Sequence, residues 1–421
     1  MAKFLVQKSK PLQGEVEISG AKNAVLPIMA AALLSEGSCV IKEVPALRDV
    51  EVTCRLLESL GSTVKENLDE HRVEINTKKI TNCEAPFELV KKMRASILVI
   101  GPLIARTGRA IIPLPGGCAI GKRPIELHLK GLKSLGTTIK EEDGYIEAIV
   151  EDKLVGSTVY LDFPSVGATE VIMMTATLAE GVTLIENAAQ EPEIVDLANF
   201  LKKMGAKIKG AGTDTIKIEG VEKLGDVTHH VIPDRIEAGT FMVAAAMTKG
   251  NILIKNILPD HVKPIIAKLK ECGTVIEMTD DGMVVRGDVN PLVSTDVKTM
   301  PYPGFPTDMQ SPFMALLTVA KGPSVVIETV FENRFMHVSE FNRMGANVKT
   351  EGNCAVIPGS KNLQGAQVVA TDLRAGAAVV LIGLLAEGTT EVSEIYHIDR
   401  GYENFAEKFR GLGATIIRLD D

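Results

Sequence analysis

The sequence predicts an α/β fold built from six repeated two-helix units. Three observations support this prediction. A short glycine signature recurs about every seventy residues, an amphipathic helix pattern precedes each copy of it, and an apolar, Ala-rich helix pattern lies further upstream in most copies.

The glycine signature consists of a large apolar residue or Cys, then Gly, two further residues, and Val or Ile. Its copies are LGSTV, LGTTI, MGAKI, CGTVI, MGANV and LGATI. Their glycines, 68 to 75 residues apart, are Gly61, Gly136, Gly205, Gly273, Gly345 and Gly413. Each glycine follows a helix pattern such as CRLLESLG or DLANFLKKMG, where it suits a helix C-cap, and the Val or Ile begins a strand pattern.

The upstream helices, such as LPIMAAALLSEG and GTFMVAAAMTKG, lack a polar face, so we expect them in the interior. The second copy, SILVIGPLIARTG, is richer in β-branched residues. Strand patterns such as CVIKEV or NILIKN follow these helices. Each repeat is therefore expected to run strand, buried helix, strand, amphipathic helix, strands.

Composition and charge exclude several classes of protein. The net charge of −8 argues against a nucleic-acid partner, and the N-terminus lacks the apolar core of a signal peptide. The most apolar helix-like run, Ala375 to Ala386, is 12 residues long, whereas a bilayer requires ~20. The six cysteines show neither metal-ligand spacing nor a disulfide framework, so we expect no metal, no cofactor and a cytoplasmic location. Cys39, Cys54, Cys272 and Cys354 lie in strand or helix patterns and are interpreted as packing residues, whereas nothing is inferred for Cys83.

Short polar clusters stand before both helices of each repeat. Carboxylates such as Asp308 and Glu191 are readily explained there as helix caps. Arginines are not, because a cation at a helix N-terminus is unfavourable unless an anion offsets it. The arginines in such clusters are Arg94, Arg123, Arg334, Arg374 and Arg400. We infer that they converge on an anionic ligand; a repeat protein with a purely structural role would not explain them.

The segment PLPGGCAIGKRP contains a glycine-flanked Cys118. It approaches the phosphate-loop pattern, but Arg123 stands where that pattern requires Ser or Thr, which argues against nucleotide hydrolysis. Nearby Lys122 and Arg123 would lower the pKa of an accessible thiol. Cys118 is therefore a candidate reactive cysteine.

Several of these segments together resemble the UDP-N-acetylglucosamine 1-carboxyvinyltransferase family of enolpyruvyl transferases: GAKNAVLP, LPGGCAIGKRP, PSVGATE, GFPTDMQSPF, ENRFMHVSEFNRMGA and ATDLRAGAA. The resemblance runs essentially end to end. It implies an inside-out α/β barrel with three repeats in each of two domains, at residues 22–231 and at 1–21 plus 232–421. It also implies an active site between the domains, with the Cys118 loop as a lid.

The resemblance implies transfer of enolpyruvyl from phosphoenolpyruvate to the 3-hydroxyl of UDP-N-acetylglucosamine through a tetrahedral ketal, in peptidoglycan precursor synthesis. Cys118 would protonate C3 of phosphoenolpyruvate and react with the inhibitor fosfomycin, and Asp308 would accept the hydroxyl proton. Phosphoenolpyruvate would be bound by Lys22, Arg123 and Arg400, with Arg94, Arg334, Asp372 and Arg374 nearby. The nucleotide sugar would contact Asn23, Arg94, Arg123, Pro124, Ile125, Glu126, Leu127, Phe163, Pro164, Ser165, Val166, Asp308 and Val330.

Two alternatives remain beside this one. An enolpyruvylshikimate-phosphate synthase would share the fold, but GAKN and Cys118 argue against it. A binding paralogue without activity would have lost Lys22, Cys118, Asp308 or Arg400, and all four are present.

Overall fold

The computed structural model describes residues 2–114, 125–359 and 362–420. They form two compact units. The first unit contains residues 20–114 and 125–232, and the second contains residues 2–19 and 233–420. Each unit has its own hydrophobic core.

The first unit contains three repeats. The first repeat comprises α1 (Lys22–Ala31), η1 (Ala32–Leu34), β3 (Ser38–Lys42), α2 (Arg48–Ser59), β4 (Thr63–Asn67), η2 (Leu68–Glu70) and β5 (Arg72–Asn76). The second comprises α3 (Phe87–Val90), η3 (Arg94–Val99), α4 (Ile100–Thr107), β6 (Arg109–Pro113), α5 (Glu126–Ser134), β7 (Thr137–Glu142) and β8 (Tyr145–Val150). The third comprises β9 (Thr158–Tyr160), α6 (Val166–Ala176), β10 (Val182–Glu186), α7 (Pro192–Lys203), β11 (Lys207–Lys209) and β12 (Thr215–Glu219).

The second unit contains the other three repeats. The fourth comprises α8 (Arg235–Met247), β14 (Asn251–Lys255), η4 (Pro259–Val262), α9 (Lys263–Glu271), β15 (Val275–Thr279) and β16 (Gly282–Arg286). The fifth comprises β17 (Val297–Lys298), η5 (Thr307–Met309), α10 (Gln310–Leu317), β18 (Ser324–Ile327), α11 (Val338–Arg343), β19 (Lys349–Glu351) and β20 (Cys354–Ile357). The sixth comprises β21 (Gln367–Val369), α12 (Leu373–Gly383), β22 (Thr389–Ser393), α13 (Tyr396–Asp399), α14 (Phe405–Gly411) and β23 (Thr415–Leu419).

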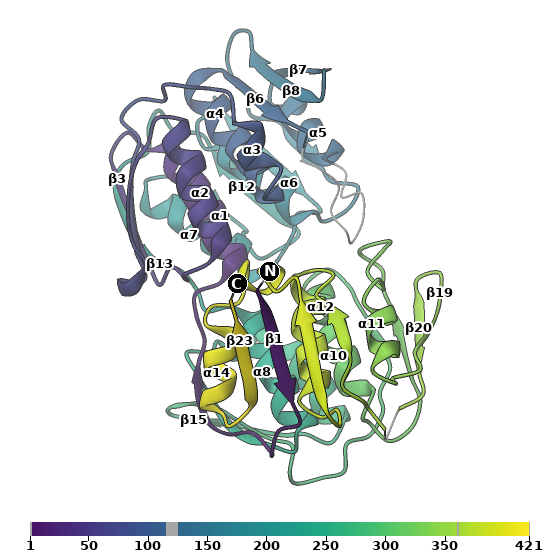
Figure 1. Cartoon of the computed structure of the whole chain (residues 1–421). Coiled ribbons are helices and arrows are strands. Elements are labelled where there is room, and N and C mark those ends of the chain that lie inside the picture. Colours follow the sequence, from purple (N-terminus) through teal and green to yellow (C-terminus); the bar gives the residue numbers. More distant parts are fainter. Residues whose placement is uncertain (1, 115–124, 360–361, 421) are drawn as a thin grey trace. The chain divides into compact units, whose positions relative to one another are not determined.

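Each repeat builds one small sheet, which is mixed except in the second repeat, where β6, β8 and β7 pair antiparallel. In the third repeat, for example, β9 lies parallel to β10, β12 lies antiparallel to β10, and β11 completes the hairpin. In the sixth, β1 (Lys3–Gln7) from the N-terminus fills the position between β22 and β23. Figure 1 shows β1 and β23 side by side. The two ends of the chain therefore close one sheet.

Two strands are exchanged where the chain passes from one unit to the other. The strand β2 (Gln13–Glu17) pairs in parallel with β14 and precedes the crossing at Ser19–Gly20. The strand β13 (Val227–His230) pairs in parallel with β3 and precedes the crossing at Ile232–Pro233. In each unit, the first strand of one sheet therefore comes just before a crossing. The helix that follows that strand along the chain belongs to the other unit.

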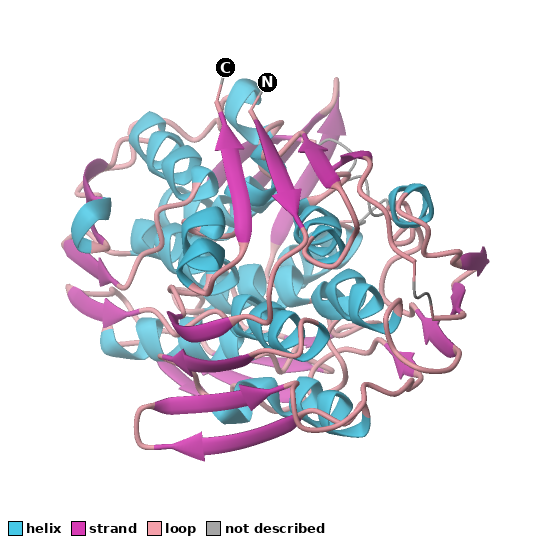
Figure 2. Cartoon of the chain, turned by 60° about the horizontal axis from the view of Figure 1, so that its bottom comes forward, coloured by secondary structure: helices cyan, strands magenta, loops and turns pink. Residues whose placement is uncertain are grey.

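The first helices of the repeats are interior, as the Ala-rich patterns predict. Nearly every residue of α1, α6, α8, α10 and α12 is buried. The strands alternate buried and exposed residues, since only one face of each sheet packs on the helices. Figure 2 shows helices toward the inside and strands around them. The fold is an inside-out α/β barrel of six repeats, as expected.

The repeated glycines mark the C-termini of the second helices. All six have positive φ, between 89° and 110°, a conformation that side-chain-bearing residues rarely adopt. Gly61, for example, follows α2 and its C-cap residue Leu60. The signature is therefore a helix-ending device, which explains why it repeats with the architecture.

Candidate functional site

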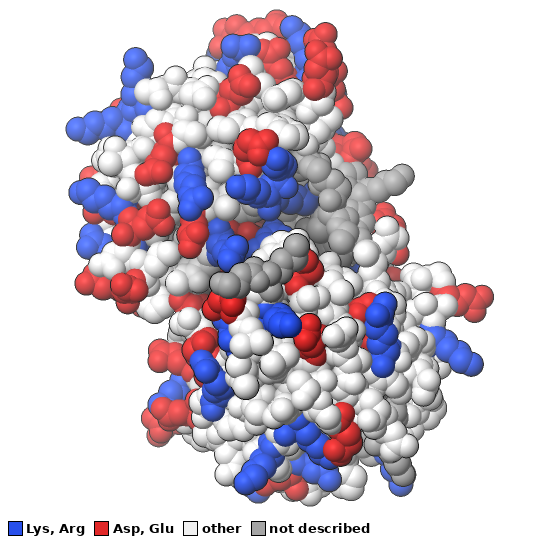
Figure 3. Space-filling view, viewed as in Figure 1, with Lys and Arg blue, Asp and Glu red and all other residues white. Residues whose placement is uncertain are grey.

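The predicted site residues fall into a group on each unit, and each group is described by itself. Cys118, Arg123 and Pro124 lie outside the described residues, as does the whole phosphate-loop-like segment. Figure 3 shows Lys and Arg interspersed with Asp and Glu over the visible face of each unit. The predicted charged site residues are therefore distinguished by their burial and their interaction partners, and not by a large surface patch of one charge.

In the first unit, Lys22 is the first residue of α1 and is buried. Its Nζ lies 2.8 Å from Oδ2 of Asp49, which is buried in the first turn of α2. The neighbouring Asn23 is exposed. An ammonium group at the start of a helix is unfavourable alone, and the Asp49 carboxylate offsets that charge. The ion pair fixes Lys22 where α1 begins.

A second cluster in this unit surrounds His128. Arg94 begins η3, and Ile125 is the N-cap residue of α5, two residues before Leu127. Burial, and to a smaller extent Arg94, lowers the pKa of His128 to about 4, so its imidazole is neutral near pH 7. A Cβ on Gly167 would lie 2.8 Å from His128 Nε2, so glycine is required for this ring to pack against the start of α6.

The loop before α6 and the first residue of this helix carry four further predicted contacts. Phe163 is exposed, and Pro164, Ser165 and Val166 are half-buried. Ser165 caps α6, because its Oγ accepts the N–H of Ala168 at 3.4 Å. Glu126, on the first turn of α5, is exposed. Of these five residues, only Glu126 carries a charged side chain.

Three buried carboxylates lie close together on α6 and at the start of α7. Burial, with further effects of Glu193 and Glu191, raises the pKa of Glu170 well above its ordinary value. Glu191 occupies the N-cap position of α7, but its side chain makes no capping hydrogen bond. The expectation that it caps the helix is therefore wrong for its side chain. The local sequence could not reveal this cluster, because Glu170 meets the other two only through packing of α6 and α7.

In the second unit, Asp308 lies between two buried arginines. Its Oδ1 accepts Arg334 Nη2 at 2.8 Å, and its Oδ2 accepts Arg374 Nε at 3.2 Å. The arginine side chains are 3% and 2% exposed, whereas that of Asp308 is 25% exposed. Asp308 lies within η5, and the N-cap residue of α10 is Met309. The alternative that Asp308 caps α10 is therefore wrong, because its carboxylate binds the arginines.

Each arginine has its own support. Arg334 Nη1 donates to Thr307 Oγ1 at 3.0 Å, and its guanidinium carbon lies 5.3 Å from the Phe331 ring centre. The guanidinium carbon of Arg374 lies 5.1 Å from the ring centre of Tyr402. Burial lowers the pKa of Arg374, but Tyr402 and Asp308 more than offset this effect, so the pKa ends above its ordinary value. The Arg374 guanidinium group therefore remains charged despite its burial.

Asp372 and His337 complete this group. Asp372 Oδ1 accepts the N–H groups of Arg374 and Ala375 at 2.8 and 3.1 Å, so this residue caps α12. Burial lowers the pKa of His337 to about 4, with Asp372 opposing this effect and Arg334 adding to it. The imidazole of His337 is therefore neutral near pH 7. Neither His337 nor Tyr402 was predicted as a site residue: His337 is the N-cap residue of α11, and Tyr402 lies between α13 and α14.

Arg400 and Val330 lie on other segments of the second unit. Arg400 is the half-buried C-cap residue of α13, and α14 begins five residues later at Phe405. The expectation that Arg400 stands just before the second helix is therefore wrong, because Arg400 ends α13 and residues 401–404 separate it from α14. At the C-terminus of α13 its charge is favourable. Val330 is half-buried, and its N–H donates to Glu328 Oε1 at 2.8 Å.

The remaining cysteines divide by burial. Cys39, Cys54 and Cys272 are buried, as expected, and burial raises the pKa of each thiol. Cys354 lies on the strand β20, as its pattern predicts, and is half-buried. Within the described ranges, no group of three or more His, Cys, Asp or Glu residues is placed to hold a metal ion.

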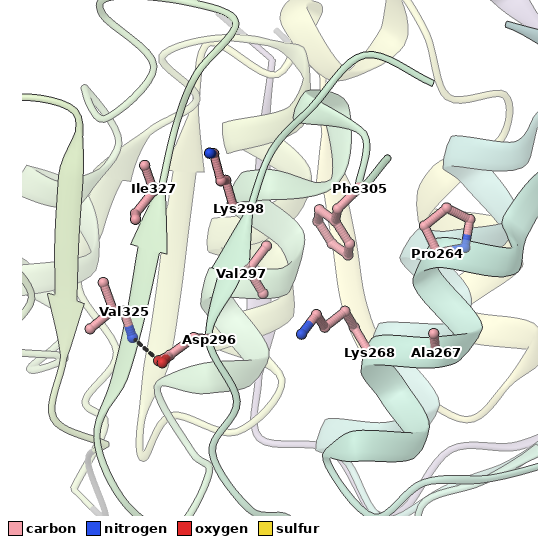
Figure 4. A pocket seen from close by; sticks show the side chains of 9 residues that line it. All are labelled: Pro264, Ala267, Lys268, Asp296, Val297, Lys298, Phe305, Val325 and Ile327. Carbon is pink, nitrogen blue, oxygen red and sulfur yellow. Dashed lines mark hydrogen bonds between the residues drawn. The ribbon is translucent and has the colours of Figure 1, made fainter. Parts of the chain in front are cut away.

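A surface hollow of about 420 Å³ lies between α9 and the strands β17 and β18 (Figure 4). Its lining includes Pro264, Phe305 and Ile327, with Lys268 extending from α9 toward β17. Asp296 at its edge accepts the N–H of Val325 at 2.7 Å. None of the predicted site residues lines it. The hollow is therefore separate from the Asp308 group.

Comparison with known proteins identifies the class. The family model described as EPSP synthase (3-phosphoshikimate 1-carboxyvinyltransferase) matches residues 6–409, and the chain belongs to this family of carboxyvinyltransferases. The fold agrees: the enolpyruvyl transferase NikO from Streptomyces tendae superimposes with a TM-score of 0.89 at 24% identity, covering 99% of this chain and 98% of NikO. EPSP synthase from Acinetobacter baumannii gives 0.76 at 19% identity, covering both chains fully.

Curated relatives narrow the class further. The chain is 61% identical over 416 residues to UDP-N-acetylglucosamine 1-carboxyvinyltransferase 1 of Caldanaerobacter subterraneus subsp. tengcongensis, covering 99% of both chains. It is 59% identical over 422 residues to UDP-N-acetylglucosamine 1-carboxyvinyltransferase 2 of Carboxydothermus hydrogenoformans, covering both chains fully. The enzyme of that name from Finegoldia magna is 57% identical over 416 residues, covering 99% of this chain and 98% of the relative. The family resemblance inferred from the sequence is confirmed.

Proposed function

We propose that this enzyme transfers the enolpyruvyl group of phosphoenolpyruvate to the 3-hydroxyl of UDP-N-acetylglucosamine and releases phosphate, as a step of peptidoglycan precursor synthesis. Three full-length relatives carry the name of this activity. The structural observation that supports it best is the partly exposed Asp308 carboxylate held by two buried arginines.

This arrangement suits a base that must remain ionised. Two guanidinium groups favour the carboxylate form of Asp308. Each carboxylate oxygen accepts an arginine N–H. A carboxylate oxygen can accept more than one hydrogen bond, so this group is suited to accept one from a sugar hydroxyl as well. Asp308 would orient the 3-hydroxyl and accept its proton as the oxygen attacks.

The reaction has two steps. In the addition, the 3-hydroxyl oxygen bonds to C2 of phosphoenolpyruvate, a proton is added to C3, and Asp308 takes the hydroxyl proton, which leaves a tetrahedral ketal. In the elimination, C3 loses a proton, the double bond forms again and phosphate departs from C2. Cys118 would supply the C3 proton in the first step.

The cations would compensate the phosphate and carboxylate charges of phosphoenolpyruvate. Lys22, Arg123 and Arg400 would bind it, with Arg94 nearby. Arg334 and Arg374 are buried and bound to Asp308, so we assign them chiefly to holding that carboxylate. Asp372 is assigned to capping α12. The residues proposed for the nucleotide sugar are Asn23, Arg94, Arg123, Pro124, Ile125, Glu126, Leu127, Phe163, Pro164, Ser165, Val166, Asp308 and Val330.

Localisation in the cytoplasm and inhibition by fosfomycin at Cys118 complete the proposal. Among the described residues, no helix combines the length and apolar character needed to cross a bilayer.

Phosphate release from phosphoenolpyruvate tests this function, measured with UDP-N-acetylglucosamine, with shikimate 3-phosphate and with no acceptor. We expect release only with the nucleotide sugar. Release with shikimate 3-phosphate alone would support the other activity named for the family, and release without an acceptor would count against both.

A further inference from the structure

The buried carboxylate of Glu328 is connected to the Asp308 group through Thr307. It follows β18 and is 2% exposed. Its Oε1 accepts Thr299 Oγ1 at 2.9 Å and the N–H groups of Val330 and Phe331 at 2.8 and 3.2 Å. Its Oε2 accepts Thr307 Oγ1 at 2.9 Å. Four donors therefore converge on one buried carboxylate, which compensates its loss of hydration.

The hydrogen bonds from Glu328 to Asp308 have a fixed direction. Thr307 has one hydroxyl proton, and it donates this proton to Glu328. Its lone pairs are therefore free to accept Arg334 Nη1 at 3.0 Å, and Arg334 Nη2 in turn donates to Asp308 Oδ1 at 2.8 Å. If Glu328 stopped accepting, the Thr307 proton would have to turn away. The contact that orients Arg334 would then lose its fixed geometry.

The same carboxylate also fixes a second segment of the proposed site. Val330 is a proposed nucleotide-sugar contact, and its N–H donates to Glu328. The preceding residue, Thr329, donates its N–H to Thr299 Oγ1 at 3.0 Å. Glu328 thus connects the loop that carries Asp308 with the segment that begins at Val330.

We propose that Glu328 is a positioning residue that, through Thr307 and Arg334, sets the orientation of Asp308 and, directly, that of the Val330 backbone. This inference rests on the proposed function. It predicts that one side chain that touches neither substrate controls both turnover and nucleotide-sugar binding. The hydrogen bonds of the Glu328 side chain go to Thr299, to Thr307 and to the backbone that carries Val330, so we expect phosphoenolpyruvate binding to be less affected than nucleotide-sugar binding.

The test compares Glu328→Gln with the wild type in steady-state kinetics for both substrates. The amide has the same shape but only one acceptor oxygen, so it cannot satisfy all four donors. Hydrogen bonds to charged groups of this kind correspond to a loss of about tenfold to a hundredfold, so we expect kcat to fall by at least about tenfold. KM for UDP-N-acetylglucosamine should rise several-fold, and KM for phosphoenolpyruvate should stay within about twofold.

Glu340→Gln is the matched control. Glu340 is also a buried carboxylate of the second unit, and it accepts the N–H of Val369 at 3.1 Å and Ser339 Oγ at 3.3 Å instead of Thr307. A purely structural effect of neutralising a buried glutamate should appear in both variants. If Glu328→Gln and Glu340→Gln alter kcat and the two KM values alike, the positioning role is refuted.

Substitutions at Thr307 keep the inference testable if Glu328→Gln folds poorly. Thr307→Val preserves the shape and removes the hydroxyl, and it should reproduce the loss in kcat. Thr307→Ser restores the hydroxyl and should lose far less. Equal losses in both variants would overturn the inference. A wild-type enzyme without nucleotide-sugar-dependent phosphate release would instead refute the proposed function.

Discussion

Replacing Asp308 by Asn should destabilise the protein as well as inactivate it. The substitution removes the counter-charge of Arg334 and Arg374, which are 3% and 2% exposed. Breaking a buried ion pair on one side costs about 3–5 kcal/mol, because the remaining charge stays desolvated. Since Asp308 is itself 25% exposed and water can partly replace it, we expect the lower end, about 3 kcal/mol.

A second substitution separates this cause from a general effect. Arg374→Met removes one of the buried charges and has a similar length. In the Asp308→Asn background it should therefore recover part of the lost stability, so that the double variant is less destabilised than the sum of the single variants. Asp399→Asn serves as a control, because Asp399 binds the better exposed Arg418 at 2.8 and 2.9 Å and should cost only about 1 kcal/mol.

The assay is urea unfolding combined with hydrogen exchange of α12 and η5. Exchange is needed because a chain of two units need not unfold in a single transition. Faster exchange in these two elements, with unchanged exchange in the first unit, is the expected result. Stability of Asp308→Asn within about 0.5 kcal/mol of wild type would show that the arginines do not depend on this carboxylate.

Three further predictions concern other residues. Cys118→Asp should keep part of the activity, since a carboxyl group can donate a proton, and should resist fosfomycin; a variant still inactivated by the compound would contradict the role of this cysteine. Tyr402→Leu should lower kcat by about tenfold, because a desolvated cation–π contact with Arg374 is lost, whereas Phe409→Leu in the same aromatic cluster should keep kcat within about twofold. Glu170 has a folded pKa raised above its ordinary 4.5, so its contribution to stability is complete below that pH and is lost as the pH rises through the folded pKa. The melting temperature of Glu170→Gln relative to wild type should therefore increase from pH 5 to pH 8, and a constant difference would argue against this assignment.

The repeat architecture was predictable because its signals are local. A glycine that ends a helix and an apolar helix without a polar face depend on neighbouring residues, so Gly61 and its five counterparts could be located from the sequence. The sequence also showed that Arg334 and Arg374 stand before predicted helices, where a positive charge is unfavourable. Their partner was not, because Asp308 meets Arg374 across 66 positions of the chain.

The sequence by itself determined the six repeats, the interior helices and the family, and it supplied the candidate residues for the proposed chemistry. Only the tertiary structure decided which of those residues act on one another. It paired Lys22 with Asp49, placed Asp308 between two buried arginines and brought Glu328 behind them. It also exchanged β2 and β13 between the sheets of the two units. The physical reason is that helix and strand patterns depend on contacts within a few residues, whereas ion pairs, buried carboxylates and strand pairing depend on distances fixed only when distant segments pack together.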